Sequence, residues 1–269
     1  MAELVELYSK GIKRKLQNYW PAWLPGTHFA IGDIGVLNGY LFEKVGSLRE
    51  LGLKYYEEVD ADSSSLDISS GSEVSVSFKA AGEVNPSFAH VGAAEVGLKV
   101  ELGSTGAFVV HAPETFESEI GDRLNLRGQV IDAFRMGRWE KDWLVVIRLL
   151  KAPSATVLIS RSSNSLLELS SRVDLSGVVA ALGAADAGVT IKYKKGDTVN
   201  MIGGKNVTPL FQLARLKTSF FSEPKLETRS LRASDPSLAD LTPSLVRADR
   251  ELEQSLTFET LTDGELTRG

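Results

Sequence analysis

Residues that could do covalent or metal chemistry are few in this chain and stand far apart. The histidines are His28, His90 and His111, and their spacing fits no local metal-binding motif. The 269 residues include no cysteine, which excludes thiolate catalysis, cysteine-ligated zinc and iron–sulfur clusters. The carboxylates are scattered, and Gly203-Gly204-Lys205 lacks the loop that a phosphate-binding motif requires. We therefore expect no enzyme, no metal and no cofactor.

Charge is distributed unevenly along the chain. The formal net charge is −5, from 30 Lys and Arg against 35 Asp and Glu. Residues 218–269 hold ten acidic and six basic residues, so the preceding 217 residues are nearly neutral. No broad basic surface is expected, which argues against nucleic acid as a partner. Glu3 and Glu6 stand where an export signal would be basic, and no apolar run approaches the length of a spanning helix. The resting chain is therefore expected in the cytoplasm.

The first segment combines an apolar stripe with a cluster of cations. Residues 3–19 are predicted to form an amphipathic helix, because apolar side chains recur there every three or four positions. One interpretation is a surface helix with solvated lysines. The other is a helix that binds anionic membranes, where each cation near the surface contributes about 1 kcal/mol. The candidate membrane-binding residues are Lys10, Lys13, Arg14 and Lys15.

Two later regions alternate strictly between apolar and polar side chains. Residues 72–81 and 95–103 are predicted to form antiparallel strands with one polar face. They are also just long enough to span a bilayer, which takes about 9–11 residues per strand. An ordinary sheet with one wet face would show the same pattern. If the strands enter a membrane, the candidate lipid-facing residues are Val74, Val76, Phe78, Val96, Leu98, Val100, Val189 and Ile191.

The rest of the body predicts a mixture of helices and strands. Pro113 is expected to open a helical stretch over residues 114–136. Trp143 to Leu150 is a β-rich apolar run, and Thr156 to Ser160 is its expected hairpin partner. A short helix is expected at 173–182, and the body closes with strands at 199–202 and 208–216.

The composition changes after Lys217. Residues 218–243 are rich in Ser and Pro and are predicted to be a linker. Residues 244–269 are predicted to form a helical tail, capped by Ser244. The candidate docking residues of this tail are Leu245, Leu252 and Leu256. The whole chain is thus expected to be α+β: a body over residues 1–217, built on a twisted, mainly antiparallel sheet with amphipathic helices packed on it, then a linker and a C-terminal helical tail.

The order of these features resembles the gasdermin family of pore-forming proteins. A basic helix comes first, then alternating strands at 66–111, a helical segment at 114–136 and a second strand region at 156–202. The stretch Gly137 to Leu150 looks like the apolar strand that follows the helical segment in that family. The length is similar to that of bacterial members with a short inhibitory tail, and the resemblance implies a role in bacterial defence through cell death. Many bacterial members carry an acylated cysteine, whereas here membrane attachment would depend on side chains alone.

Two functional hypotheses follow. In the first, the chain is a latent pore-former: a protease releases the tail, and the body oligomerises in an anionic membrane through amphipathic β-hairpins. The expected partners are then the lipid membrane, an activating protease and further copies of the chain, and the activated form moves from the cytoplasm to the membrane. In the second, the chain is a non-enzymatic cytoplasmic β-rich binding or scaffold module whose tail docks on a partner.

Overall fold

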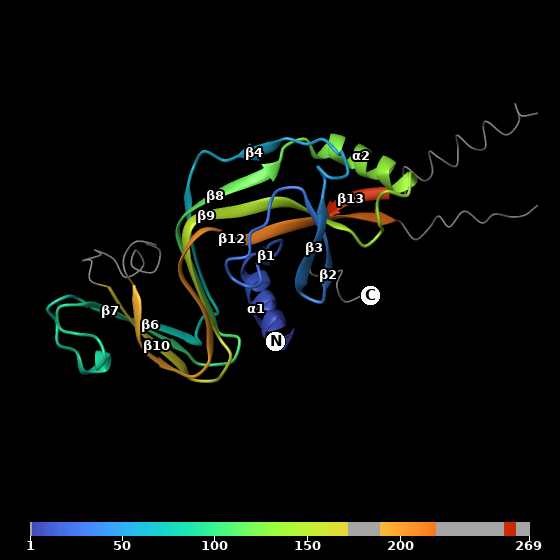
Figure 1. Ribbon diagram of the computed structural model, residues 1–269. Helices are drawn as coiled ribbons and strands as arrows, with labels where there is room; N and C mark the ends of the chain where they lie inside the picture. Colours follow the sequence, from blue (N-terminus) through green and yellow to red (C-terminus); the bar gives the residue numbers. More distant parts are fainter. Residues whose placement is uncertain (1, 172–188, 219–255, 262–269) are drawn as a thin grey trace, which may run out of the picture.

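The computed structural model describes residues 2–171, 189–218 and 256–261 of the chain. Two sheets of antiparallel strands dominate it, with two α-helices packed alongside (Figure 1). This confirms the α+β class with a mainly antiparallel sheet. In chain order the elements are α1 (Ala2–Lys15), β1 (Trp20–Pro21), β2 (Asp33–Asn38), β3 (Leu41–Ser47), β4 (Glu57–Val59), β5 (Ser64–Ser69), β6 (Val74–Lys79), the 3-10 turn η1 (Pro86–Phe88), β7 (Val96–Leu102), β8 (Phe108–Ile120), α2 (Arg123–Arg135), β9 (Leu144–Ser160), β10 (Ser165–Ser171), β11 (Thr190–Lys195), β12 (Thr198–Thr218) and β13 (Leu256–Thr260). The short helix predicted at 173–182 lies outside the described residues.

The larger, nine-stranded sheet is built on β9 and β12, which are 17 and 21 residues long. β12 pairs with one edge of β9, and β8 and β2 pair with the other. The prediction of a hairpin between Trp143–Leu150 and Thr156–Ser160 is therefore wrong, because both segments belong to β9. The strands expected at 199–202 and 208–216 are likewise one strand, β12. Pro153 and the glycines before Lys205 interrupt the local pattern without ending either strand.

The long strands curve round α1 (Figure 1), and their ladders are interrupted at two prolines. Between β8 and β9, pairing stops after His111 opposite Thr156 and resumes at Phe116 opposite Lys151. Pro113 lies in this gap on β8, and Pro153 lies in it on β9. Proline donates no backbone hydrogen bond, so it is tolerated where a ladder is already broken. Both prolines thus lie where the β8–β9 ladder is already interrupted.

α1 packs on the concave side of the curved sheet, as its apolar stripe predicted. Leu4, Tyr8 and Ile12 are buried in one cluster with side chains of β5, β8, β9 and β12. Gly11 allows this close packing, because a Cβ atom there would lie 2.4 Å from the Phe108 ring. The helix ends at Lys15, four residues earlier than predicted.

α2 is shorter than the predicted helix over 114–136. It begins at Arg123, where the Asp122 carboxylate accepts a hydrogen bond from the backbone N–H of Asn125 (2.9 Å). Pro113 does not open a helix, because the chain continues as strand β8 to Ile120. Pairing with β4, β5 and β9 provides hydrogen-bond partners for the backbone of β8 in this region. The interaction with three neighbouring strands outweighs the local helical spacing.

The described part of the tail is a strand, which corrects the helix predicted for Leu256 and its neighbours. β13 pairs antiparallel with the last residues of β12, from Thr218 opposite Leu256 to Ala214 opposite Thr260. Leu245 and Leu252, the other two predicted docking residues, lie outside the described residues.

Candidate functional site

The four-stranded sheet unites the two regions of alternating sequence. Its order is β11-β10-β7-β6, so β7 and β10, which are distant in sequence, form its centre. In the β6–β7 hairpin, Val74 pairs with Leu102, Val76 with Val100 and Phe78 with Leu98. Residues that pair across two strands share a face of the sheet. The candidate lipid-facing residues of β6 and β7 are therefore brought together on one side, here called the inner face.

The inner face covers one end of the larger sheet. Leu98, Val100 and Leu102 of β7 are buried with Leu167 and Leu169 of β10 against side chains of β8 and β9, such as Val109 and Leu158. Burying apolar area in this way is the main force that holds the two sheets together.

The edge strands of the four-stranded sheet are less covered. Val100 is fully buried at the centre, whereas Val76 on β6 is 44% exposed and Ile191 on β11 is 40% exposed. Val189, just before β11, is partly buried against the same cluster. The candidate residues thus form one apolar face that is partly open at its two edges.

The opposite, outer face is polar. On β6 it carries Ser75 and Ser77, which pair with Glu101 and Lys99 of β7. Lys99 and Glu101 form an ion pair at 2.9 Å. Apolar and polar side chains are therefore separated by face across the β6–β7 hairpin, as the period of two predicted.

A loop of residues 80–95 lies over this outer face, which sequence reasoning did not find. The segment links β6 to β7, and the sequence pattern indicated only that it separates the alternating regions 72–81 and 95–103. Phe88 and His90 of the loop contact residues of β7, β10 and β11, and carbonyls of the loop accept hydrogen bonds from Lys79 at the end of β6. The local signal for this loop is Lys79, which lies opposite Gly97 in the β6–β7 pairing. The contact of His90 with Glu168 has no local signal, because the two residues are 78 positions apart.

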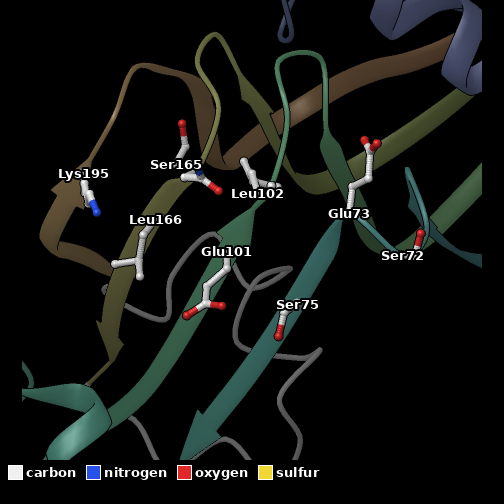
Figure 2. A pocket seen from close by; sticks show the side chains of 10 residues that line it. Ser72, Glu73, Ser75, Glu101, Leu102, Ser165, Leu166 and Lys195 are labelled. Atoms are coloured by element: carbon white, nitrogen blue, oxygen red, sulfur yellow. The ribbon is translucent and has the colours of Figure 1, made fainter.

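A shallow pocket of about 360 Å³ opens at one end of the four-stranded sheet. Figure 2 shows Glu73, Glu101 and Lys195 projecting from separate segments without converging on one point. Among the described residues no group of three or more His, Asp or Glu side chains could hold a metal ion. The pocket therefore offers polar contacts but no reactive constellation.

The candidate membrane-binding cations of α1 do not form one exposed patch. Arg14 and Lys15 are exposed, and Lys10 is paired with Glu6 at 2.6 Å, which raises the pKa of the Lys10 ammonium group. Lys13 points into the protein, is 2% exposed, and places its ammonium group 3.1 Å from the centroid of the Trp20 ring. In this conformation Lys13 is not available to a lipid surface. No helix in the described residues is long and apolar enough to cross a bilayer.

The tail strand is fastened to the body by side chains as well as by its backbone. Leu261, directly after β13, is 3% exposed in the core next to α2, and its N–H donates to the Leu213 carbonyl at 2.7 Å. Phe258 packs against the same core. Glu259 pairs with Lys217 at 3.0 Å. The described part of the tail, residues 256–261, therefore docks on the edge of β12, and not on α1 or on the strands at 72–102.

No protein-family model matches the sequence, and no curated protein matches it either. Two solved structures are similar in fold. One is the cryo-EM structure of the gasdermin A3 membrane pore, with 11% identity and a TM-score of 0.31, covering 85% of this chain and 97% of that one. The other is a bacterial gasdermin from Bradyrhizobium tropiciagri, with 13% identity and a TM-score of 0.35, covering 80% of this chain and 88% of that one. Both structures are gasdermins, the family that the order of elements in this sequence resembles.

Proposed function

We propose that the chain is a latent pore-forming protein. After a protease cuts within residues 218–243 and the tail leaves, copies assemble in an anionic membrane through two amphipathic hairpins. The observation that carries this proposal is the separation of faces in the four-stranded sheet, apolar inside and polar outside. The body covers the apolar face in the resting form, and lipid chains would cover it in a membrane.

The edges of this sheet favour assembly of several copies. Within the described residues, β6 and β11 each have a strand partner on one side only. Lipid cannot satisfy unpaired backbone N–H and C=O groups, so a sheet that enters a bilayer must close its edges. Pairing of β6 in one copy with β11 in the next would do so and would produce a ring.

The first contact with the membrane is assigned to α1. Its exposed cations, Arg14 and Lys15, attract anionic head groups, and Lys10 adds to this attraction where lipid phosphate replaces Glu6. Lys13 would join them only after α1 leaves Trp20. The resting form is placed in the cytoplasm, and the activated form at the membrane.

The tail supports latency through β13. Its strand pairing and the burial of Leu261 favour the closed form, and a preference of a few kcal/mol is enough to keep the open form rare. Cutting the linker turns this intramolecular contact into a bimolecular one, which dilution then weakens.

The test is dye release from phosphatidylglycerol vesicles, with phosphatidylcholine vesicles as the lipid control. A protease site is placed within residues 225–240, and cut and uncut protein are compared at equal concentration. We expect release only from phosphatidylglycerol vesicles and only after cutting. Absence of release by cut protein at concentrations where it binds the vesicles would reject the proposal.

One observation favours the second candidate, a scaffold with a docking tail. The edge of β12 already accepts a strand in β13, and a partner's strand could bind there in the same way. This function predicts that cut protein binds a peptide of residues 254–263 reversibly and never releases dye. Dye release that this peptide inhibits would instead support the pore-former.

A further inference from the structure

The 80–95 loop closes over the polar face of the sheet through an aromatic anchor. Phe88 is almost fully buried although it lies over the polar side of the sheet. It packs on bare backbone, because a Cβ atom at Gly97 would lie 2.9 Å from the Phe88 ring. Only glycine at this position of β7 leaves space for the ring.

A buried lysine ties the same loop to β6. Lys79 is 1% exposed, and its ammonium group donates hydrogen bonds to the carbonyls of Gly92 (3.0 Å), Ala93 (3.4 Å) and Glu95 (2.9 Å). A buried ammonium group is stable only while such acceptors are present. If the loop lifts, Lys79 faces water, so opening replaces these bonds with hydration.

The third attachment joins the loop of the β6–β7 hairpin to the antiparallel pair β10–β11, here called the second hairpin. Nδ1 of His90 lies 3.0 Å from a carboxylate oxygen of Glu168 on β10. The His90 ring also stacks on Tyr193 of β11, with ring centroids 4.2 Å apart and planes 3° apart. Lys192 of β11 pairs with Glu95 at 2.9 Å. The loop therefore bridges all four strands.

The residues of the loop would also lengthen the hairpin. β6 and β7 contain six and seven residues, whereas a strand needs about 9–11 to cross a bilayer. The present register pairs Lys79 with Gly97. If this register continued, Ala80, Gly82 and Val84 would extend the apolar face.

The polar face would continue as well. In the same register Glu83 and Glu95 fall on the side of Ser75 and Ser77, so the alternation persists into the loop. Val84, which is 83% exposed in the resting form, then gains an apolar environment. The sequence of the loop is thus compatible with two forms, but the folded-back loop and the long hairpin cannot exist together.

We propose that the 80–95 loop is a clasp that holds both hairpins in their short resting form, and that it must open before they lengthen. This inference rests on the proposed pore-forming function. The clasp would be a second level of regulation besides the tail. Removing β13 frees the body, and the clasp then sets the rate at which the short hairpins become long ones.

A disulfide lock tests the clasp, and the absence of native cysteine removes any background. In the double variant Phe88→Cys/Gly97→Cys, a Cβ at residue 97 meets a ring atom only two bonds from the Phe88 Cβ, so the two cysteines lie close together, and loss of free thiol confirms that the disulfide has formed. The protein is cut in the linker and added to phosphatidylglycerol vesicles before and after reduction. We expect no release from the oxidised form and release after reduction. Equal release from both forms would reject the clasp while keeping the pore.

A second variant acts in the opposite direction and does not depend on a disulfide. Gly97→Ala drives Phe88 from its seat, so hydrogen exchange of residues 80–95 and dye release should both accelerate several-fold. Gly128→Ala on α2 is the control, because no atom lies within 4 Å of its added methyl group. Faster exchange without faster release would reject the clasp. If cut wild-type protein releases no dye at all, the pore-forming function itself is wrong.

Discussion

The ammonium group of Lys13 lies over the indole ring of Trp20, 3.1 Å from the ring centroid. This cation–π contact links α1 to β1, at the edge of β12. A desolvated contact of this kind contributes about 2 kcal/mol. Lys13 stabilises the resting fold and is also a candidate for attracting lipid. It cannot do both at once, because it must leave Trp20 before it can reach a lipid head group.

Lys13→Gln should therefore destabilise the resting protein by about 1–2 kcal/mol, because the charge over the ring is lost. Urea unfolding at neutral pH measures this change. Lys15→Gln, on the exposed side of the same helix, is the control and should change the free energy of unfolding by less than about 0.5 kcal/mol. Equal effects of the two substitutions would show that the contact with Trp20 contributes nothing.

Leu261→Ala should loosen the tail while leaving the body folded. Truncating a buried leucine costs about 2–5 kcal/mol, and the loss falls on the docked segment. We expect faster hydrogen exchange at residues 256–261 and dye release by uncut protein. Lys217→Ala removes a half-exposed ion pair with Glu259, which is worth less than about 1 kcal/mol, and should leave both measurements nearly unchanged. Unchanged exchange in Leu261→Ala would contradict the anchoring role.

The two faces of β6 should respond differently to a new charge. Val76→Asp places a carboxylate on the apolar face at an exposed edge, so the protein should fold, yet release by cut protein should fall strongly because a lipid-facing charge is unfavourable. Ser77→Asp adds the same charge to the polar face and should retain release. Circular dichroism confirms folding of both variants. Similar release by the two would argue against membrane insertion of this strand.

Glu119 should contribute to stability in a pH-dependent manner. Burial alone would raise the pKa of this carboxyl, but the guanidinium groups of Arg148 and Arg123 outweigh burial and lower the pKa below its ordinary value. The Arg148 Nε donates to it at 2.9 Å and Arg123 at 2.7 Å. A lowered pKa gives stability that is present above the unfolded value of about 4.3 and is lost as the pH falls through the folded value.

The gap in unfolding free energy between wild type and Glu119→Gln should therefore be largest at neutral pH and should shrink on acidification below about pH 4. Urea unfolding between pH 7 and pH 3 measures it. Glu140→Gln, at an exposed position, provides the control. A gap for Glu119→Gln that stays constant over this range would show that the carboxylate gains nothing from its arginines.

The sequence predicted best those elements whose pattern is local and long. The stripe of α1 and the alternation of β7 were visible because the apolar face of each is buried and the opposite face is more exposed. β8 was misread between Pro113 and Ile120, because spacing near proline suggested a helix and its strand partners lie far along the chain. β9 and β12 were each divided in two, since proline and glycine mark ends more often than bends.

The site depended more on distant contacts. The inward direction of Lys13 follows from Trp20 packing beneath it, and helical spacing does not report such a neighbour. The tail was predicted as a helix because Leu245, Leu252 and Leu256 fit one stripe, whereas pairing with β12 makes Leu256 part of a strand. The attachment of His90 to Glu168 and Tyr193 joins segments about 80 and 100 residues apart, beyond the reach of local patterns.

The interrupted ladder at Pro113 and Pro153 has a mechanical consequence for α1. The cluster beneath this helix includes Leu150 and Ala152 on one side of the interruption, and Val157 and Ile159 on the other. At this joint β8 and β9 are not paired with each other, and β9 keeps its pairing only with β12, so part of the rigidity must come from what packs across it. α1 packs across this joint and contacts side chains on both sides of it. Any swing of the four-stranded sheet relative to the larger one must therefore disturb the packing of α1, and departure of α1 removes this support and leaves the β9–β12 ladder to hold the joint.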